Sequence, residues 1–266
     1  MSESLDERLS RLERQVALLE THSVEAFWTA LDRAYEAILP HRELACIVCG
    51  RSGLRSSFRV LVDRCMFGGG TLERYQCPAC DAVFGPQKYL DLSEQLVSRD
   101  HALLYSRYSE ADSTDNEIRT FRSLNPRAGH IYLNWGCGAW SKTIPQLRAE
   151  GFDVWGFETS APTSAAYIVT GRDQISAKFD GVFSNNVIEH FRNPQRQLKD
   201  FYDLLKPGGV MAHSSPCYKY EYAFTRFHTL FLLGRSADVL AERTGFRITE
   251  RIENGEYINV VFAALD

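Results

Sequence analysis

A glycine turn between a buried strand and a helix is the feature that most constrains this chain. Residues 131–135 are apolar enough for a buried strand, and Gly136-Cys137-Gly138 separates them from a helical pattern at residues 141–150. Glycines at such a turn let a ligand approach the backbone beside the helix N-terminus. From residue 131 onward strands and helices alternate, which predicts a doubly wound, mostly parallel α/β sheet.

Two further features define this sheet. The strand at residues 153–158 ends in Glu158, where a carboxylate can accept hydrogen bonds from both hydroxyls of a ribose. Near the end of the chain, two strand patterns flank Asn254-Gly255, which is a hairpin signal. We therefore expect the last two strands to run antiparallel to each other, so that the last strand is antiparallel in the sheet.

Later segments resemble class I S-adenosylmethionine-dependent methyltransferases. Residues 179–191 resemble the family's fourth strand with its following pair Glu189-His190, and residues 205–211 resemble its L-K-P-G-G turn into the fifth strand. With the glycine turn, the acidic strand end and the hairpin, these motifs stand in the family's order over about residues 120–266. The resemblance implies a Rossmann-like methyltransferase domain, which we place at residues 128–266.

The resemblance also implies which residues bind the cofactor: Asn134, Gly136, Gly138, Glu158, Asp173 and Asn185. The two glycines would border the methionine part, Glu158 would bind the ribose, and Asn185 would lie under the sulfonium. The family's adenine-binding acid usually follows the third strand, which is abbreviated here together with its helix, and Asp173 is the candidate for that acid.

Two departures from the family pattern leave an alternative open. Asn134 stands where the family usually has Asp, so its amide can bind the cofactor amine but carries no charge. Trp140 stands where a third glycine is frequent, and its side chain would cover the site. The alternative is a non-catalytic, zinc-dependent scaffold with a degenerate cofactor site. Dinucleotide binding is disfavoured, because L-K-P-G-G is not part of that fingerprint.

Two C-x-x-C pairs predict a structural zinc site, with the ligands Cys46, Cys49, Cys77 and Cys80. Each pair places two thiolates on one side of a turn, and two pairs complete a closed tetrahedral site. Redox dithiols and unmetallated core cysteines are the alternatives. We expect a small zinc-ribbon-like module at residues 41–90, joined by a helical linker at residues 91–127 to the catalytic domain.

Residues 1–40 are expected to be helical. One apolar stripe has the spacing of a heptad and consists of Leu5, Leu9, Leu12, Val16 and Leu19. The phase then slips, and Ser23 is a plausible N-cap for a second helix. The stripe predicts a coiled coil and a homo-oligomer, most simply a dimer. The alternative is an amphipathic helix that packs on its own chain.

The charge and hydropathy of the chain limit its partners. The formal net charge is −4, whereas nucleic-acid binders usually show a basic field. We therefore do not expect nucleic acid as a partner, and an RNA methyltransferase is the alternative function. No segment approaches the ~20 apolar residues that cross a bilayer, and the N-terminus lacks the apolar core of a signal peptide. We expect no membrane span and a cytoplasmic location.

The chemistry needs a positioned acceptor and, for some acceptors, a base. His190 follows the fourth strand, near the expected methyl group, and His228 resembles a family histidine in the aromatic-rich segment 214–231. Both are candidate bases, although Glu189-His190 can instead serve only to cap and orient the following helix. Some ubiquinone-pathway O-methyltransferases hold a divalent cation with E-x-x-E-H, but Asn186 replaces the first carboxylate here, so we do not expect a catalytic metal.

The combination of a zinc module with this domain resembles bacterial sugar methyltransferases that have an N-terminal zinc-binding part. That resemblance implies a small-molecule, sugar or surface-glycan acceptor, as in polysaccharide biosynthesis. Aromatic faces and a few cations in segment 214–231 suit a sugar ring or an aromatic acceptor. The same segment can also be a helix that packs its aromatic face on the sheet.

Overall fold

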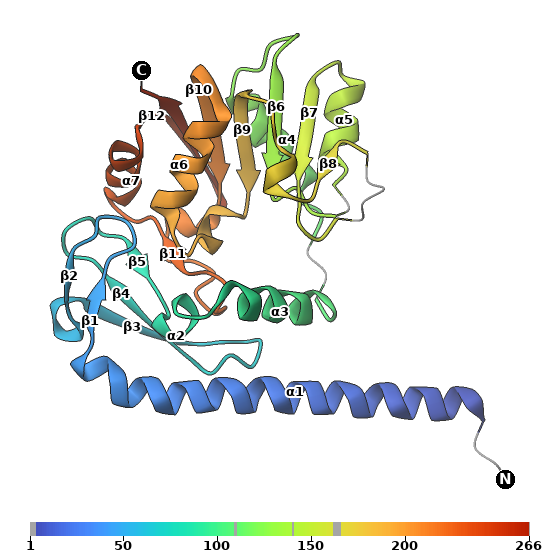
Figure 1. Ribbon diagram of the computed structural model, residues 1–266, viewed down its shortest axis with the longest axis vertical. Helices are drawn as coiled ribbons and strands as arrows, with labels where there is room; N and C mark the ends of the chain where they lie inside the picture. Colours follow the sequence, from blue (N-terminus) through green and yellow to red (C-terminus); the bar gives the residue numbers. More distant parts are fainter. Residues whose placement is uncertain (1–3, 109–110, 140, 162–165, 266) are drawn as a thin grey trace.

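The computed structural model describes residues 4–108, 111–139, 141–161 and 166–265. These residues form an α/β domain, a smaller β-rich module and one long helix that runs beneath both (Figure 1). Trp140, which we expected to cover the cofactor site, lies outside the described residues. No helix within the described ranges is both long and apolar enough to cross a membrane.

The α/β domain is built on a seven-stranded sheet with the order β12-β13-β10-β9-β6-β7-β8. Its strands are β6 (Ile131–Trp135), β7 (Asp153–Phe157), β8 (Ile168–Val169), β9 (Phe179–Asn185), β10 (Leu205–Ser214), β12 (Phe246–Asn254) and β13 (Tyr257–Ala264). Strands β6 to β10 pair in parallel, whereas β13 lies antiparallel between β10 and β12. This confirms the predicted doubly wound sheet with an antiparallel last strand.

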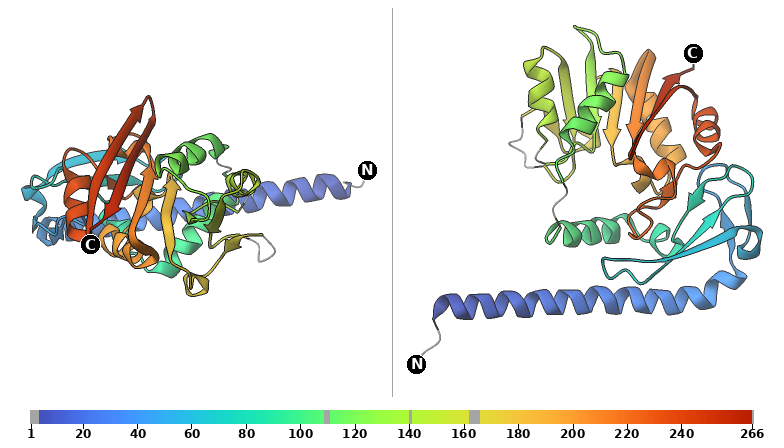
Figure 2. Two further views of the ribbon diagram at one scale, coloured as in Figure 1. Left: turned by 90° about the horizontal axis from the view of Figure 1, so that it is seen from above. Right: turned by 180° about the vertical axis from the view of Figure 1, so that it is seen from behind.

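Helices cover both faces of this sheet (Figure 2). Helices α4 (Thr114–Ser123) and α5 (Thr143–Ala149) pack on one face, and α6 (Pro194–Leu204) and α7 (Ser236–Thr244) on the other. Neighbouring strand residues therefore enter opposite layers: Val182 packs with α6 and α7, and Phe183 with α4 and α5. Burial on both faces explains why the central strands are almost continuously apolar.

The smaller module contains a hairpin and a four-stranded antiparallel sheet. The hairpin pairs β1 (Glu43–Ala45) with β2 (Ser52–Leu54). The sheet has the order β11-β5-β4-β3, formed by β3 (Arg59–Arg64), β4 (Thr71–Gln76), β5 (Val83–Phe84) and β11 (Leu230–Phe231). Strand β11 comes from the segment that follows β10, so the α/β domain contributes one edge of the module's sheet.

The first forty residues contain one helix instead of two. Helix α1 runs without a break from Leu5 to Ile38, and Ser4 and Glu7 form its capping box. The expected N-cap at Ser23 is wrong, because the Ser23 hydroxyl donates to the Leu19 carbonyl within the helix. A serine hydroxyl that donates to a carbonyl of the preceding turn has its hydrogen-bond partner inside the helix. It therefore does not cap the start of a second helix.

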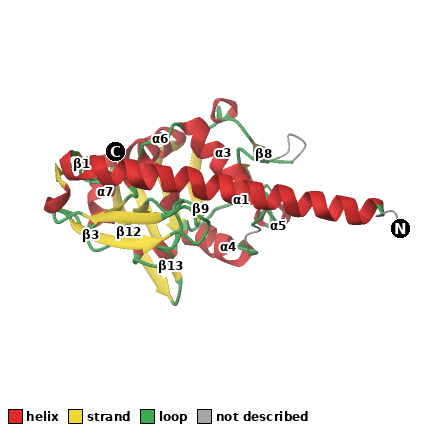
Figure 3. Cartoon of the chain, turned by 90° about the horizontal axis from the view of Figure 1, so that it is seen from below, coloured by secondary structure: helices red, strands yellow, loops and turns green. Residues whose placement is uncertain are grey.

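The two halves of α1 have different surroundings (Figure 3). In its second half, Trp28 is buried and stacks on Tyr89 of α2 (Gln87–Leu90). Near its middle, Arg107 binds Glu20 and Thr21 just beyond α3 (Glu94–Tyr105). In its first half, the predicted stripe is exposed, from 51% at Val16 to 79% at Leu5. The part of the chain that the structure describes therefore leaves the apolar stripe of α1 exposed.

Candidate cofactor and acceptor site

The carboxyl ends of the parallel strands meet at one edge of the sheet, where ligands of such folds bind. Gly136 and Gly138 lie in the turn after β6 with φ angles of 69° and 73°. A Cβ atom at Gly136 would stand 2.7 Å from Cγ2 of Val187, in the loop after β9. The turn therefore requires glycine at position 136 for two reasons: the backbone conformation and the approach of Val187.

Glu158 follows β7 and reaches the glycine turn. Its Oε2 accepts a hydrogen bond from the Gly138 backbone amide at 3.3 Å, and its Oε1 accepts from the amide and hydroxyl of Ser160 at 2.9 and 2.8 Å. These bonds hold the carboxylate beside the turn. The structure thus brings Gly136, Gly138 and Glu158 together, as the sequence predicts.

Asn134 is buried at the end of β6, and it is paired with a carboxylate that sequence reasoning missed. Its Nδ2 donates to Oε2 of Glu117 at 2.7 Å, while the Ser113 hydroxyl donates to Oε1 of Glu117 at 2.6 Å. Glu117 is 7% exposed and lies on α4. It restores a negative charge next to the position where the family's aspartate is replaced by Asn134. The sequence does carry a signal for Glu117: it stands four residues before Phe121 and seven before Leu124, so it lies on the apolar face of the helix.

Asn185, at the end of β9, belongs to a second polar chain on the same edge. Its Oδ1 accepts from the Ser214 hydroxyl at 2.7 Å, and the Thr120 hydroxyl lies 2.7 Å from that of Ser214. Asn134 Oδ1 and Asn185 Nδ2 are buried and have no hydrogen-bond partner among the described residues. S-adenosylmethionine carries an amine that can donate to such an acceptor and a carboxylate that can accept from such a donor, so these residues fit the cofactor.

Asp173 is the predicted residue that lies apart from this cluster. It is exposed in a short 3₁₀ helix (Arg172–Gln174) beyond β8. Strand β8 has only two residues, and the carbonyl of Val169 accepts a hydrogen bond from the Glu158 amide at 3.0 Å. Asp173 therefore follows the strand that lies beside Glu158, at the β8 end of the sheet.

His190 and His228 lie side by side, although they are distant in the sequence. The two rings are perpendicular, with centroids 5.0 Å apart. Burial, reinforced by His228 and His101, lowers the pKa of His190 well below its ordinary value. Burial likewise lowers the pKa of His228 to about 4. Both imidazoles are therefore neutral at neutral pH, each with a free lone pair, but they are weaker bases than an exposed histidine.

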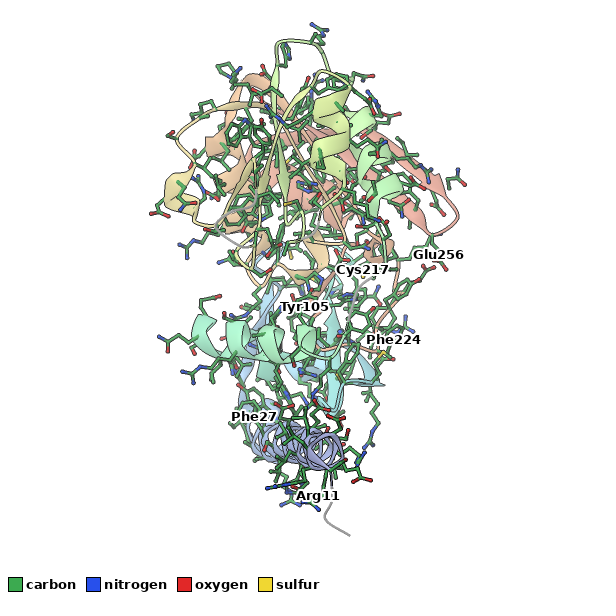
Figure 4. The ribbon with its side chains drawn as sticks, turned by 90° about the vertical axis from the view of Figure 1, so that its right-hand side faces the viewer. Arg11, Phe27, Tyr105, Cys217, Phe224 and Glu256 are labelled. Carbon is green, nitrogen blue, oxygen red and sulfur yellow. The ribbon has the colours of Figure 1, made fainter. Side chains whose placement is uncertain are left out.

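The segment that carries His228 is held by the module. The guanidinium of Arg74, fully buried in β4, donates to the carbonyls of Ala223 and Thr225 at 2.6 Å each and to that of His228 at 3.1 Å. Figure 4 shows Cys217 between the α/β domain and the smaller module, where it packs with Val83 of β5, and Phe224 further along the same segment. Segment 214–231 contains a 3₁₀ helix (Pro216–Tyr218) and β11 but no α-helix, so the alternative of a helix packed on the sheet is wrong.

The four predicted metal ligands converge at the other end of the module. Their sulfur atoms all lie within 4.8 Å of one another, with Sγ–Sγ distances of 3.7 Å for Cys46 and Cys80 and 3.5 Å for Cys49 and Cys77. A tetrahedron with Zn–S bonds of about 2.3 Å has S–S edges of about 3.8 Å. All four cysteines are free thiols, so the cluster has the composition and size of a Cys₄ metal site.

The two knuckles share one backbone geometry. Gly50 donates to the Cys46 carbonyl and Asp81 to the Cys77 carbonyl, both at 2.9 Å. Gly50 has a φ angle of 77° and Asp81 one of 69°, so each knuckle turns through a left-handed residue directly after its second cysteine. This repetition explains how two pairs distant in sequence present four sulfur atoms to one point.

Comparison with known proteins agrees with this geometry. The family model described as "Methyltransferase domain" matches residues 116–251, just over half of the chain. A search of curated protein sequences gave no match. The chain belongs to the methyltransferase-domain family. It is an S-adenosylmethionine-dependent methyltransferase with a Rossmann-like fold.

Solved structures resemble the chain at low identity. The 1,6-didemethyltoxoflavin-N1-methyltransferase from Burkholderia thailandensis, solved with S-adenosylhomocysteine, is 16% identical, with 73% of this chain and 96% of that chain covered and a TM-score of 0.49. A TehB-like methyltransferase from Corynebacterium glutamicum is 19% identical, with 65% and 97% covered and a TM-score of 0.42. A methyltransferase from Mesorhizobium loti is 16% identical, with 56% and 97% covered and a TM-score of 0.40.

The glycine turn generates a prediction about cofactor affinity. We expect Gly136→Ala to weaken S-adenosylhomocysteine binding at least tenfold in calorimetry, because the new Cβ must displace Val187 and open the turn. Gly208→Ala is the matched control, since Gly208 has a similar φ of 72° but open space around its Cβ position. Equal affinity in the wild type and Gly136→Ala would contradict the placement of the cofactor at this turn.

Proposed function

We propose that the protein transfers a methyl group from S-adenosylmethionine to a small-molecule, sugar or surface-glycan acceptor held by residues 214–231. The observation that supports this most is the segment itself: it follows β10, carries His228 beside His190, and is held by Arg74 of the module. Pairing of β11 with β5 fixes its far end. The module's role would be to shape the acceptor site.

The cofactor would lie along the carboxyl edge of the sheet. Its methionine part would contact Gly136, Gly138 and Asn134, its ribose Glu158, and its adenine Asp173. Asn185 would lie under the sulfonium. To these we add Glu117, whose buried carboxylate would face the cofactor's ammonium group and supply the charge that Asn134 lacks.

The reaction is an in-line displacement in which the acceptor atom attacks the methyl carbon and the bond to sulfur breaks. The protein's main contribution is to align the acceptor with the methyl group. His190 and His228 would be the functional side chains closest to the acceptor, with neutral ring nitrogens available for its proton or for another ligand.

An acceptor screen tests the proposed function. We expect methyl transfer from labelled S-adenosylmethionine to a member of a panel of nucleotide sugars, glycans and small hydroxylated or aromatic compounds. Labelled RNA as the sole product would contradict the proposal in favour of RNA methylation. Full-strength cofactor binding without transfer to any class would favour the scaffold alternative.

The role of Glu117 is tested by calorimetry. Glu117→Gln should weaken binding of S-adenosylmethionine by about 1–3 kcal/mol, because the cofactor amine loses a charge-assisted partner in a buried site. Glu158→Ala should weaken it by a similar amount through the ribose. The matched control is Glu94→Gln, whose carboxylate is exposed on α3 and binds Arg192. Unchanged affinity in Glu117→Gln would remove Glu117 from the site.

We propose that Cys46, Cys49, Cys77 and Cys80 hold one structural zinc ion. Elemental analysis should give one zinc per chain in the wild type and a marked loss in Cys77→Ser, with Cys65→Ser as a control outside the cluster. Loss of the metal should open residues 41–90 and 214–235 to proteolysis together, because β11 pairs with β5. Zinc content that does not respond to Cys77→Ser would refute the site.

We also propose that the protein is a dimer formed through the first half of α1. Burying each stripe side chain is worth ~1.5–3 kcal/mol at most, and the chain itself leaves all of them exposed. Light scattering should therefore show a dimer for the full chain and a monomer for a chain that begins at Ser23. Leu12→Asn should shift the equilibrium toward monomer, whereas Leu18→Asn, which is exposed off the stripe, should not. A monomeric full chain would refute the coiled coil.

A further inference from the structure

We propose that Glu189, His190 and His228 form a second metal site, which binds one divalent transition-metal cation at the acceptor end of the cofactor site. One potential ligand atom from each of these side chains lies within 4.8 Å of the other two. The set combines two imidazoles with one carboxylate, which is a donor set used for divalent iron, manganese and related cations. It shares no residue with the cysteine cluster.

Backbone pairing brings the three ligands together. Glu189 and His190 lie in a 3₁₀ helix (Ile188–His190) directly after β9. The Thr229 amide donates to the Glu189 carbonyl at 2.8 Å, and the Thr229 hydroxyl reaches the carbonyls of Glu189 and Phe191 at 3.4 and 3.3 Å. His228 is therefore fixed opposite the Glu189-His190 pair. Because it comes from a separate segment, a search for E-x-x-E-H does not find it, and our expectation of no catalytic metal rested on that motif.

Both imidazoles have a lone pair available in the arrangement shown. His228 Nδ1 lies 3.0 Å from the carbonyl of Tyr222, so this nitrogen carries the proton and the lone pair is on Nε2. Nδ1 of His190 is buried and has no hydrogen-bond partner among the described residues. Metal-binding histidines typically donate their other ring nitrogen to a carbonyl or carboxylate, which orients the ring. The Tyr222 carbonyl has this role for His228.

The place of the site suggests its chemical use. Val187 touches the glycine turn, and Glu189 lies two residues further along the same loop, so the cation would stand between the cofactor and segment 214–231. Three protein ligands leave coordination positions open for the acceptor. This inference rests on the proposed methyl transfer, and it narrows the acceptor to a molecule with a hydroxyl, or two neighbouring oxygens, that can bind the metal.

The proposed methyl transfer needs no protein side chain as a base. The cation lowers the pKa of the bound hydroxyl, which loses its proton to solvent water. The resulting oxygen attacks the methyl carbon, the carbon–sulfur bond breaks, and the electron pair stays on sulfur, which becomes the neutral thioether. His190 and His228 then act as ligands of the cation, and neither has to accept the proton of the acceptor.

Titration with manganese tests the site directly. The full-length protein, with zinc in its cysteine cluster and freed of loosely bound metal by dialysis, is titrated with Mn²⁺ and followed by electron paramagnetic resonance. We expect one Mn²⁺ per chain, with affinity reduced at least tenfold in His228→Ala and in the isosteric Glu189→Gln. His22→Ala, an exposed histidine on α1, is the matched control and should bind as the wild type does.

Binding of S-adenosylhomocysteine is measured on the same samples and separates the two proposals. If it binds but neither Mn²⁺, Ni²⁺ nor added Zn²⁺ occupies a site outside the cysteine cluster, the metal inference is overturned and the histidines keep the role of bases. Equal Mn²⁺ affinity in the wild type and both ligand variants also overturns it. If S-adenosylhomocysteine does not bind, the proposed function fails irrespective of the metal result.

Discussion

The buried guanidinium of Arg74 is the interaction on which the arrangement of this protein depends. Burial of a charge is unfavourable unless it is paired and hydrogen-bonded, and desolvation lowers the pKa of Arg74. Its donors are directed to three carbonyls of the segment after β10, and Asp63 lies 3.6 Å away. These bonds tie the module and the segment to each other. Arg74 stands in β4, which leads directly into Cys77, so the same strand connects the surroundings of His228 with the cysteine cluster.

A second constraint acts within the sheet. Parallel strands place all their carboxyl ends at one edge, so the turn after β6, the acid after β7 and the loop after β9 meet there regardless of what lies between them in sequence. Glu117 joins them because α4 packs across this edge with its apolar face inward. The proposed cofactor and acceptor regions share the loop that runs from Val187 to His190. A change in that loop would therefore affect both.

The two halves of the long helix α1 differ in their contacts with the rest of the chain. Its C-terminal half is part of the fold, since Trp28 packs on Tyr89 and Asp32 binds the buried ammonium of Lys88. Its N-terminal half extends past these contacts with an apolar stripe facing water. Among the described residues, this half of the helix adds nothing to the hydrophobic core of its own chain. Burial of its apolar side chains would be favourable, so we expect a second copy of the chain to cover the stripe.

The sequence by itself determined the α/β class, the antiparallel last strand, the glycine turn and the convergence of the two cysteine pairs. Each of these follows from local patterns: alternation of strands and helices, residues that permit positive φ, and ligand spacing. It did not predict that α1 is continuous, because whether the Ser23 hydroxyl caps a new helix or bonds back to Leu19 depends on what packs around it.

Only the tertiary structure decided which distant residues share the site. Three contacts join parts of the chain that no sequence pattern connects. Glu117 pairs with Asn134, Arg74 donates hydrogen bonds to segment 214–231, and His228 lies close to Glu189 and His190. Such contacts arise when elements pack, since burial requires each polar group to find a partner wherever the fold provides one. Local patterns specify elements, whereas the partners of buried polar groups are specified by the whole fold.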